Sequence, residues 1–294
     1  MSIIRAIKNT MKALQNTNVN LLMLNKALIH KDIEEFKNKL RIDNPKNLIP
    51  YGYKMYSQGD EDGIINEIFN RIGETNKIFV EFGSGNGLAG NTLALLFKNW
   101  SGLWIDGSLD DINEVKMGFP KTIESGRLMV THALITKNNI NELISSKIKN
   151  EEIDLLSVDI DGNDYHIFNE ITCIKPRVVV MEYNWHFVPP TLYCMNYNEK
   201  YKWQQDDCFG ASLKFLEINL AQRGYCLVGC CLVGNNAFFV REDLVEDKFL
   251  EPFSAEMHFE PFKVWINKSY YRDGWNKPPS YKTLESSLSA VDND

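Results

Sequence analysis

Strand-like and helix-like segments alternate along most of this chain, and the alternation restricts the folds that are open to it. The run Arg177–Met181 is rich in β-branched residues, as is typical of a strand buried on both faces of a sheet. Six further strand-like runs cover residues 77–82, 101–105, 127–130, 153–158, 225–228 and 237–240. Helices are predicted at 62–72, 90–99, 165–170 and 212–222. This order predicts an α/β fold with a mostly parallel, doubly wound sheet, and it favours a hairpin for the last two strands.

The size of the chain suits one such domain with additions at both ends. We expect a sheet domain at 49–250, an N-terminal helical extension at 1–48, and a C-terminal extension at 251–294 whose tail, from Ser286 on, is disordered. A net charge of −7 argues against a general nucleic-acid partner, which would need a basic surface. We recognise no signal peptide or bilayer-spanning run, so a cytoplasmic protein without membrane insertion is expected. The six cysteines match no zinc pattern and are expected to be free thiols.

The first helix carries a stripe with alternating steps of four and three residues. The stripe consists of Leu22, Lys26, Ile29, Ile33, Phe36 and Leu40, and Asn44–Pro45 ends the helix. Two interpretations stay open: the helix packs on its own domain, or it mediates a homodimer.

The segment Phe79–Gly87 places a glycine-rich turn between a hydrophobic strand and a helix. Such glycines let the backbone approach a ligand closely. A dinucleotide-binding turn needs a third glycine, where this chain has Leu88. S-adenosylmethionine (SAM) carries no phosphate, and Glu81 suits its cationic methionine end. We therefore favour SAM over a dinucleotide or a purely structural turn.

The second strand ends at Asp106, about 25 residues after Glu81. A carboxylate at this place can accept hydrogen bonds from both ribose hydroxyls of a nucleoside, although an aspartate before Gly107 is also a common turn residue. The loop after the third strand, with His132 and Ala133, would lie beside the adenine. For His132 we favour a structural role over a ligand contact.

Four motifs in a fixed order carry a resemblance to a known family. They are Ser57-Gln58 with Glu61-Asp62-Gly63, Val80-Glu81-Phe82-Gly83, Trp104–Ser108 and Ser157–Asp164, and Gly234–Val240 adds to them. Over roughly residues 50 to 245 the chain resembles the FkbM-like SAM-dependent O-methyltransferases. One departure is Asp161, where the commoner family pattern has Glu before Gly.

The resemblance implies a Rossmann-like class I methyltransferase fold with a seven-stranded sheet and helices on both faces. It also implies O-methylation of a small-molecule or glycan acceptor, such as a sugar or surface-glycan precursor. The expected SAM contacts are Gln58, Glu81, Gly83, Ser84, Gly85, Asp106, Gly107, Ser108, Ala133 and Asp159. Two alternatives stay open, a non-catalytic SAM-binding partner in a biosynthetic complex and an NAD-type oxidoreductase, against which Leu88 argues.

Catalytic groups are expected where the fourth and fifth strands end, beside the crevice of the sheet. An alcohol acceptor must lose its proton, and carboxylates or a histidine can take it. The candidates are Asp161, Asp164, Glu182 and His186. Asp161 and Glu182 would also suit Mg²⁺, whose preferred ligands are oxygens. The competing interpretations are helix capping for Asp161 and Asp164 and a structural hydrogen-bonding anchor for Glu182.

The segment Trp185–Cys208 holds six aromatic residues and the pair Pro189-Pro190. Aromatic faces pack on sugar rings, but they also pack in protein cores. We predict that this segment forms a lid over the acceptor pocket.

Overall fold

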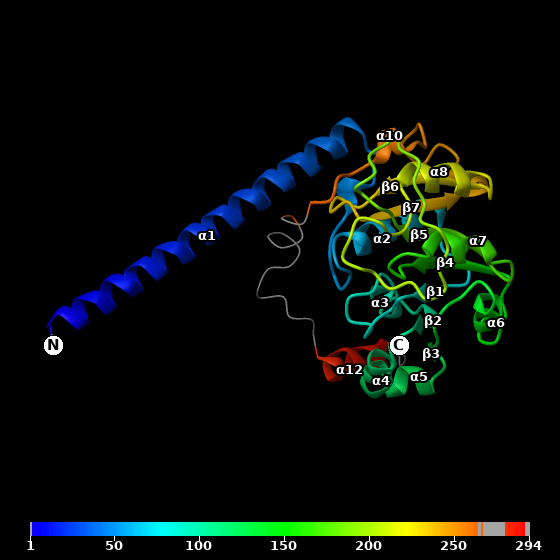
Figure 1. Ribbon diagram of the computed structural model, residues 1–294, viewed down its shortest axis with the longest axis horizontal. Helices are drawn as coiled ribbons and strands as arrows, with labels where there is room; N and C mark the ends of the chain where they lie inside the picture. Colours follow the sequence, from blue (N-terminus) through cyan, green and yellow to red (C-terminus); the bar gives the residue numbers. More distant parts are fainter. Residues whose placement is uncertain (1, 264–265, 267–279, 292–294) are drawn as a thin grey trace.

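The structure is a computed structural model that describes residues 2–263, 266 and 280–291, and in this part of the chain one sheet holds seven strands (Figure 1). The strands are β1 Ile78–Phe82, β2 Ser101–Asp106, β3 Leu128–His132, β4 Glu152–Val158, β5 Lys175–Glu182, β6 Tyr225–Cys230 and β7 Asn236–Arg241. Their order is β3-β2-β1-β4-β5-β7-β6, and only β7 runs antiparallel to its neighbours. The predicted Rossmann-like fold with a mostly parallel seven-stranded sheet and the β6–β7 hairpin are confirmed.

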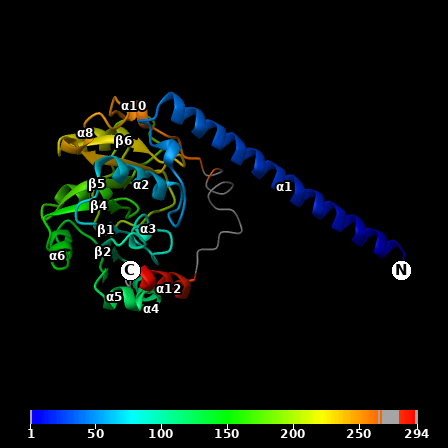
Figure 2. The same cartoon turned by 180° about the vertical axis from the view of Figure 1, so that it is seen from behind.

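Helices cover both faces of the sheet (Figures 1 and 2). They are α1 Ser2–Asp43, η1 Ile49–Tyr51, α2 Glu61–Ile72, α3 Leu93–Leu96, α4 Leu109–Gly118, α5 Pro120–Glu124, α6 Ile140–Ser145, α7 Asp164–Glu170, α8 Leu213–Ala221, α9 Glu242–Val245, α10 Ala255–His258 and α12 Tyr281–Val291. Alternate residues of β5 belong to two different hydrophobic clusters, Val178 and Val180 to one and Val179 and Met181 to the other. The sheet is therefore buried on both faces, as the β-branched run predicts.

The strand order reverses direction between β1 and β4, and this reversal positions the site. In a doubly wound sheet a crevice opens beyond the carboxyl ends of the strands at such a point. The β4–β5 register pairs Val158 with Met181, so Asp159 and Glu182 follow at neighbouring strand ends. Opposite Glu182, on β7, lies Asn236.

Helix α3 is shorter than expected, because it covers only Leu93–Leu96 rather than 90–99. The side chain of Glu81 accepts hydrogen bonds from the backbone nitrogen of Asn91 and from Oγ1 of Thr92. These contacts hold residues 90–92 as a loop against β1, so that the helix begins only at Leu93.

The prediction of a disordered tail from Ser286 is wrong for residues 286–291, which belong to α12. Leu284 and Leu288 are buried, and Glu285 accepts hydrogen bonds from the backbone nitrogens of Lys121 and Thr122 at the start of α5. A small, polar composition is thus compatible with a helix once a packing surface is available. Residues 292–294 of the predicted tail lie outside the described residues.

Helix α1 packs on the domain only through its C-terminal part, near Ile33 and Lys37 (Figure 1). Ile29 and Leu40 of the predicted stripe also contact the core, whereas Leu22 and Phe36 stay 58% and 47% exposed. The rest of the helix extends away from the sheet domain. Within the described residues, we find no helix with the length and apolar character that crossing a membrane requires.

Candidate cofactor and acceptor site

A cavity of about 540 Å³ opens at the carboxyl ends of β1, β2, β4 and β5, within the range of small-molecule sites. Ten of the predicted site residues line it: Gln58, Gly83, Gly85, Asp106, Gly107, Ser108, Ala133, Asp159, Asp161 and Glu182. A smaller cavity of about 130 Å³ shares Gln58, Gly83, Gly85 and Asp159 with it and adds Glu81 and Ser84. The structure therefore brings together, from five loops, most of the residues that the sequence singles out.

The glycine turn after β1 is shaped by its contact with the end of β4. Gly83 has φ of +71°, and a Cβ atom there would lie 1.6 Å from the carbonyl oxygen of Asp159. Only glycine fits this close approach in this backbone conformation. The turn can thus reach the floor of the cavity without a side chain in between.

Asp106 holds two segments of the cavity wall together. Its carboxylate accepts hydrogen bonds of 2.7 Å from the backbone nitrogens of Gly85 and Ser108. The turn role and the ligand-binding role that the sequence suggests for Asp106 are compatible, because Asp106 organises its own turn and also lines the cavity. A carboxylate has about four acceptor sites, so capacity for ribose hydroxyls remains.

Glu81 is buried, with 3% of its surface exposed, and burial raises its pKa to about 7. Its carboxylate organises the loop at Asn91 and Thr92 and also lines the smaller cavity. The prediction that it faces the methionine end of SAM stays a prediction.

Two buried polar atoms at the smaller cavity lack a hydrogen-bond partner within the described part of the chain: Oγ of Ser84 and Oδ1 of Asn236. The two residues are 5% and 3% exposed. The amide nitrogen of Asn236 donates to Glu61, which fixes the orientation of the side chain. Buried polar groups are normally paired, so these two atoms beside the cavity are candidates for contact with a polar ligand.

Asn236 is a site residue that the sequence analysis missed. The motif Gly234-Asn235-Asn236 suggested a hairpin turn and a family likeness, but no contact with a ligand. Asn235 and Glu199 also line the main cavity without having been predicted as ligand contacts, whereas Tyr201, which lines it too, belongs to the aromatic segment predicted as a lid.

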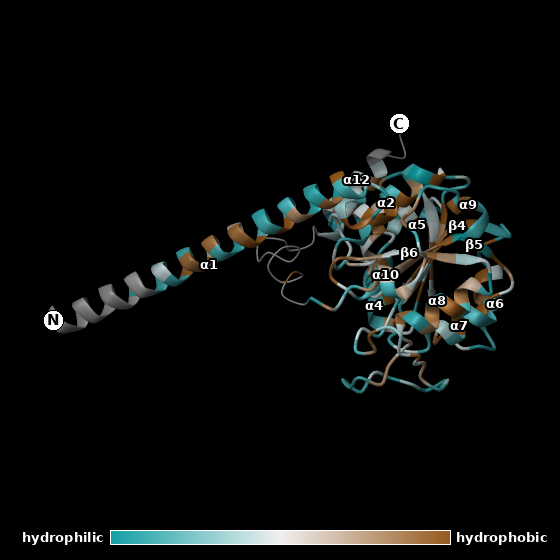
Figure 3. Cartoon of the chain, turned by 90° about the horizontal axis from the view of Figure 1, so that it is seen from above, coloured by the Kyte–Doolittle hydropathy of each residue, from teal (hydrophilic) through white to brown (hydrophobic). Residues whose placement is uncertain are grey.

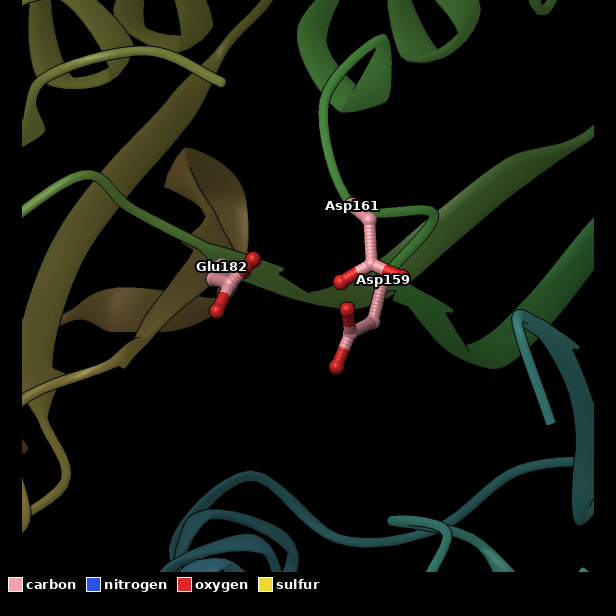
Figure 4. A group of neighbouring side chains, drawn as sticks. All are labelled: Asp159, Asp161 and Glu182. Carbon is pink, nitrogen blue, oxygen red and sulfur yellow. The ribbon is translucent and has the colours of Figure 1, made fainter. Parts of the chain in front are cut away.

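Three carboxyl groups gather where β4 and β5 end (Figure 4). One oxygen each of Asp159, Asp161 and Glu182 lies within 4.8 Å of the others, and the side chains point toward one another. No hydrogen bond to these groups occurs among the described residues, although Asp159 and Glu182 are partly buried. Burial, and after it the neighbouring carboxylates, raises the pKa of both Asp159 and Glu182.

Asp161 lies in the left-handed backbone region, with φ of 58°, which aspartate tolerates better than most residues. Asp164 holds this loop in place, because its carboxylate accepts hydrogen bonds of 2.8 Å from the nitrogens of Ile160 and Gly162. Asp164 lines neither cavity. The geometry thus favours a positioning role for Asp164 over the predicted catalytic one.

The two histidines considered in the sequence lie apart from the carboxylates. His186 lines neither cavity and pairs with Asp207 at 3.2 Å. A ring nitrogen of His132 lies 3.1 Å from the carbonyl oxygen of Gly107, in line with a structural role. Nothing in this arrangement supports His186 as a base.

The segment Trp185–Cys208 reaches the main cavity through Glu199 and Tyr201. The ring of Tyr201 packs so closely over Gly162 that a Cβ atom there would lie 2.4 Å from it. Tyr197 instead packs near His166 and Lys137, and Trp203 is 50% exposed. Tyr201 is therefore the aromatic residue of this segment at the site.

No protein-family model and no curated protein sequence matches the chain. Among solved structures it is similar to a Staphylococcus aureus protein provisionally described as a caffeoyl-CoA O-methyltransferase, with TM-score 0.45, 12% identity, and coverage of 74% of this chain and 99% of that one.

Two further solved structures are similar at a comparable level. The O-methyltransferase from Bacillus cereus in complex with SAH gives TM-score 0.41 and 13% identity, over 71% of this chain and 89% of that one. The bifunctional kinase-methyltransferase WbdD gives TM-score 0.37 and 14% identity, over 63% and 40%. At these values none of the three assigns a function to this chain.

Proposed function

We propose that the protein is a SAM-dependent O-methyltransferase of the FkbM-like type, acting on a hydroxyl of a small polar acceptor such as a sugar or surface-glycan precursor. The observation that carries the proposal is the pairing of two neighbouring features. Among the described residues, buried polar atoms without a hydrogen-bond partner lie at the smaller cavity, and carboxylates without one lie in the larger cavity.

The residues present fit the functional groups of SAM. Its methionine end offers an ammonium donor and a carboxylate acceptor, which suit Oδ1 of Asn236 and the hydroxyl of Ser84. Asp106 suits the ribose hydroxyls, and Ala133 with its neighbours Leu134 and Ile135 suits the adenine ring. A phosphate-binding turn is not required, in agreement with Leu88.

The carboxylate cluster supports the assignment of an alcohol acceptor. When bound, SAM supplies an electrophilic methyl group. Asp161 and Glu182 would hold the acceptor hydroxyl, and one of the two carboxylates would take its proton as the oxygen bonds to the methyl group and SAM leaves as the neutral thioether SAH. Burial, and after it the charge of Asp159, raises the pKa of Glu182, which strengthens this carboxylate as a base.

The same three carboxylates also fit a divalent cation such as Mg²⁺, since all of their donors are oxygens. A cation bound there would lower the pKa of the acceptor hydroxyl. Addition of EDTA distinguishes deprotonation by a carboxylate alone from activation by a bound cation, because it abolishes activity only if the cation is required.

A sugar acceptor is supported by the lining of the larger cavity. Tyr201 offers an aromatic ring, and Asn163, Glu199 and Asn235 offer polar groups for hydroxyls. Sugars present both an apolar ring face and hydroxyls, so the combination suits them.

The test compares two variants that each remove a buried, unpartnered hydroxyl. Ser84→Ala should weaken SAM binding about 10-fold in calorimetry, since one hydrogen bond to a charged group is lost. Thr131→Val is the matched control, because Oγ1 of Thr131 is also unpartnered but Thr131 lines neither cavity. Equal SAM affinity for both variants and the wild type would remove the assigned site.

Asn236→Ala and Asp106→Ala extend the test to the two ends of the cofactor. Each should weaken SAM binding by about 1 to 3 kcal/mol. A methyl-transfer assay with sugar acceptors then distinguishes an enzyme from a protein that binds SAM without turnover.

A further inference from the structure

Helix α1 is far longer than its contact with the domain requires. It has 42 residues, about 60 Å at 1.5 Å per residue. The contact with the domain centres on Ile33 and Lys37, where Nζ of Lys37 donates a hydrogen bond to the carbonyl oxygen of Gly52. All side chains described before Lys26 are exposed. The N-terminal half of α1 therefore extends from the domain as a separate rod (Figures 1 and 2).

This rod exposes a concentration of large apolar side chains. Val19, Leu21, Leu22, Met23, Leu24 and Leu28 are each 49% to 58% exposed. Figure 3 shows these turns in brown along the projecting helix. Contiguous apolar surface of this kind is uncommon on a monomer and is typical of an interaction surface.

The spacing within the rod defines a heptad seam. Asn18, Leu21, Asn25 and Leu28 follow one another in steps of three, four and three, with asparagine at the a positions and leucine at the d positions. In the sequence, Ile4, Ile7, Met11 and Leu14 continue the same steps toward the N-terminus. Leu22 and Leu24 then flank the seam at e and g.

We propose that α1 pairs with α1 of a second copy of this chain as a parallel two-stranded coiled coil over residues 4–28. The buried leucines at d remove the exposed apolar surface from water. Asparagine at a position a pairs with its own counterpart only in a parallel, in-register dimer, where it specifies register and strand number. Two such asparagines, seven residues apart, point to this arrangement.

The five positive charges of the rod repel those of a second copy, but three of them lie away from the seam. Residues 1–31 carry Arg5, Lys8, Lys12, Lys26 and Lys31 and no acidic residue. Arg5, Lys12 and Lys26 occupy b positions, on the outside of the coil. An anionic membrane would suit this charge, but it would bury Asn18 and Asn25 in the middle of the apolar stripe without partners, which is costly.

The first experiment measures the mass of the full chain by light scattering. A dimer of about twice 33.9 kDa is expected. Leu21→Asp combined with Leu28→Asp should give the monomer, because charges would be buried in the seam. The matched control, Val19→Asp combined with Met23→Asp, changes b and f positions and should stay dimeric. A monomeric wild type, or equal effects of the two pairs, overturns the proposal.

A second experiment tests the orientation of the helices. Asn18→Cys should form an intermolecular disulfide under mild oxidation, beyond the background of the native thiols, whereas Met23→Cys on the outside should not. A dimer without this selective cross-link would overturn the parallel register. A monomer that binds vesicles of anionic lipid would assign the rod to a membrane instead. The proposal does not depend on the methyltransferase assignment, because the seam variants should retain the SAM affinity of the wild type.

Discussion

Strand β4 carries Asp154 near one end and is followed by Asp159 at the other, and the two carboxylates have opposite surroundings. Asp154 is fully buried and accepts hydrogen bonds from Thr75, Asn76, Lys77 and Arg177. Burial acts to raise its pKa, but the bonds from Arg177 and the backbone outweigh burial and lower it. Asp159 has no such donor among the described residues, and burial together with neighbouring carboxylates raises its pKa.

The difference separates a structural carboxylate from one available to a ligand. Asp154 fastens the segment before β1 to β4 and to Arg177 of β5, so its acceptor sites are used within the fold. Asp159, Asp161 and Glu182 lie at the carboxyl ends of the strands, where none of the described residues donates a hydrogen bond to them. Carboxylates left unpaired in this way destabilise the protein, and such strain is common at functional sites.

Removing the buried carboxylate of Asp154 should have the largest effect on stability. Asp154→Ala leaves the guanidinium of Arg177 buried without its partner and should lower the free energy of unfolding by about 3 to 5 kcal/mol. Urea unfolding followed by circular dichroism measures the change. Asp110→Ala, at an exposed position, is the control and should change stability by less than about 0.5 kcal/mol. If the two variants unfold alike, Asp154 has no special structural role.

Neutralising the carboxylates at the cavity should reduce activity and leave the fold intact. Asp161→Asn and Glu182→Gln should each lower kcat for methyl transfer at least about 100-fold, the usual scale for a general base. SAM affinity should stay close to that of the wild type, which calorimetry checks. Unchanged kcat in both variants would mean that positioning alone accounts for the reaction.

Neutralising Asp159 sharpens the comparison, because it should change stability in the opposite direction. Asp159→Asn removes one charge from a crowded, partly buried cluster and should raise the urea midpoint at pH 7. A folded-state pKa above the unfolded one means that the charged form opposes folding, so the gain should vanish at acid pH, where the wild type is protonated. A lower midpoint at pH 7 would contradict the assigned electrostatics.

The pH dependence at Asp154 should have the reverse sign. Its folded-state pKa lies below the ordinary value of 3.8, so its contribution is present above that pH and lost as the pH falls through the folded-state pKa. The stability difference between wild type and Asp154→Asn should thus be full at pH 7 and shrink below about pH 4. Unfolding curves across this range test it, and a difference that is constant with pH would contradict it.

The smallest effect is expected at Tyr201, the aromatic residue that lines the larger cavity. Tyr201→Ala should raise KM for a sugar acceptor about 5-fold, with little change in KM for SAM, because a packed aromatic contact is worth about 1 kcal/mol. Trp203→Ala, at a residue that lines neither cavity, is the control. Equal KM values for both variants would show that Tyr201 only supports the loop at Gly162.

The sheet and the location of the crevice could be predicted from the amino-acid sequence alone. Hydrophobic periodicity is a local property, and all seven strands lie within a few residues of their predicted positions. The glycine turn and the acidic residues at the strand ends could also be predicted. In a parallel sheet, a glycine at position 83 and carboxylates at the ends of β4 and β5 lie beside the same crevice.

Which of these polar groups is available to a ligand depends on contacts that form only in the folded protein. Asp161 and Asp164 are equivalent in the sequence pattern, yet Asp164 is used by the nitrogens of its own loop and Asp161 is not. Ser84 and Asn236 are 152 residues apart and meet at one cavity through the β1-β4-β5-β7 order of the sheet. Likewise, the tail becomes a helix where Leu284 and Leu288 find a surface. Periodicity is fixed by neighbours along the chain, whereas hydrogen-bond satisfaction depends on groups that only folding brings together.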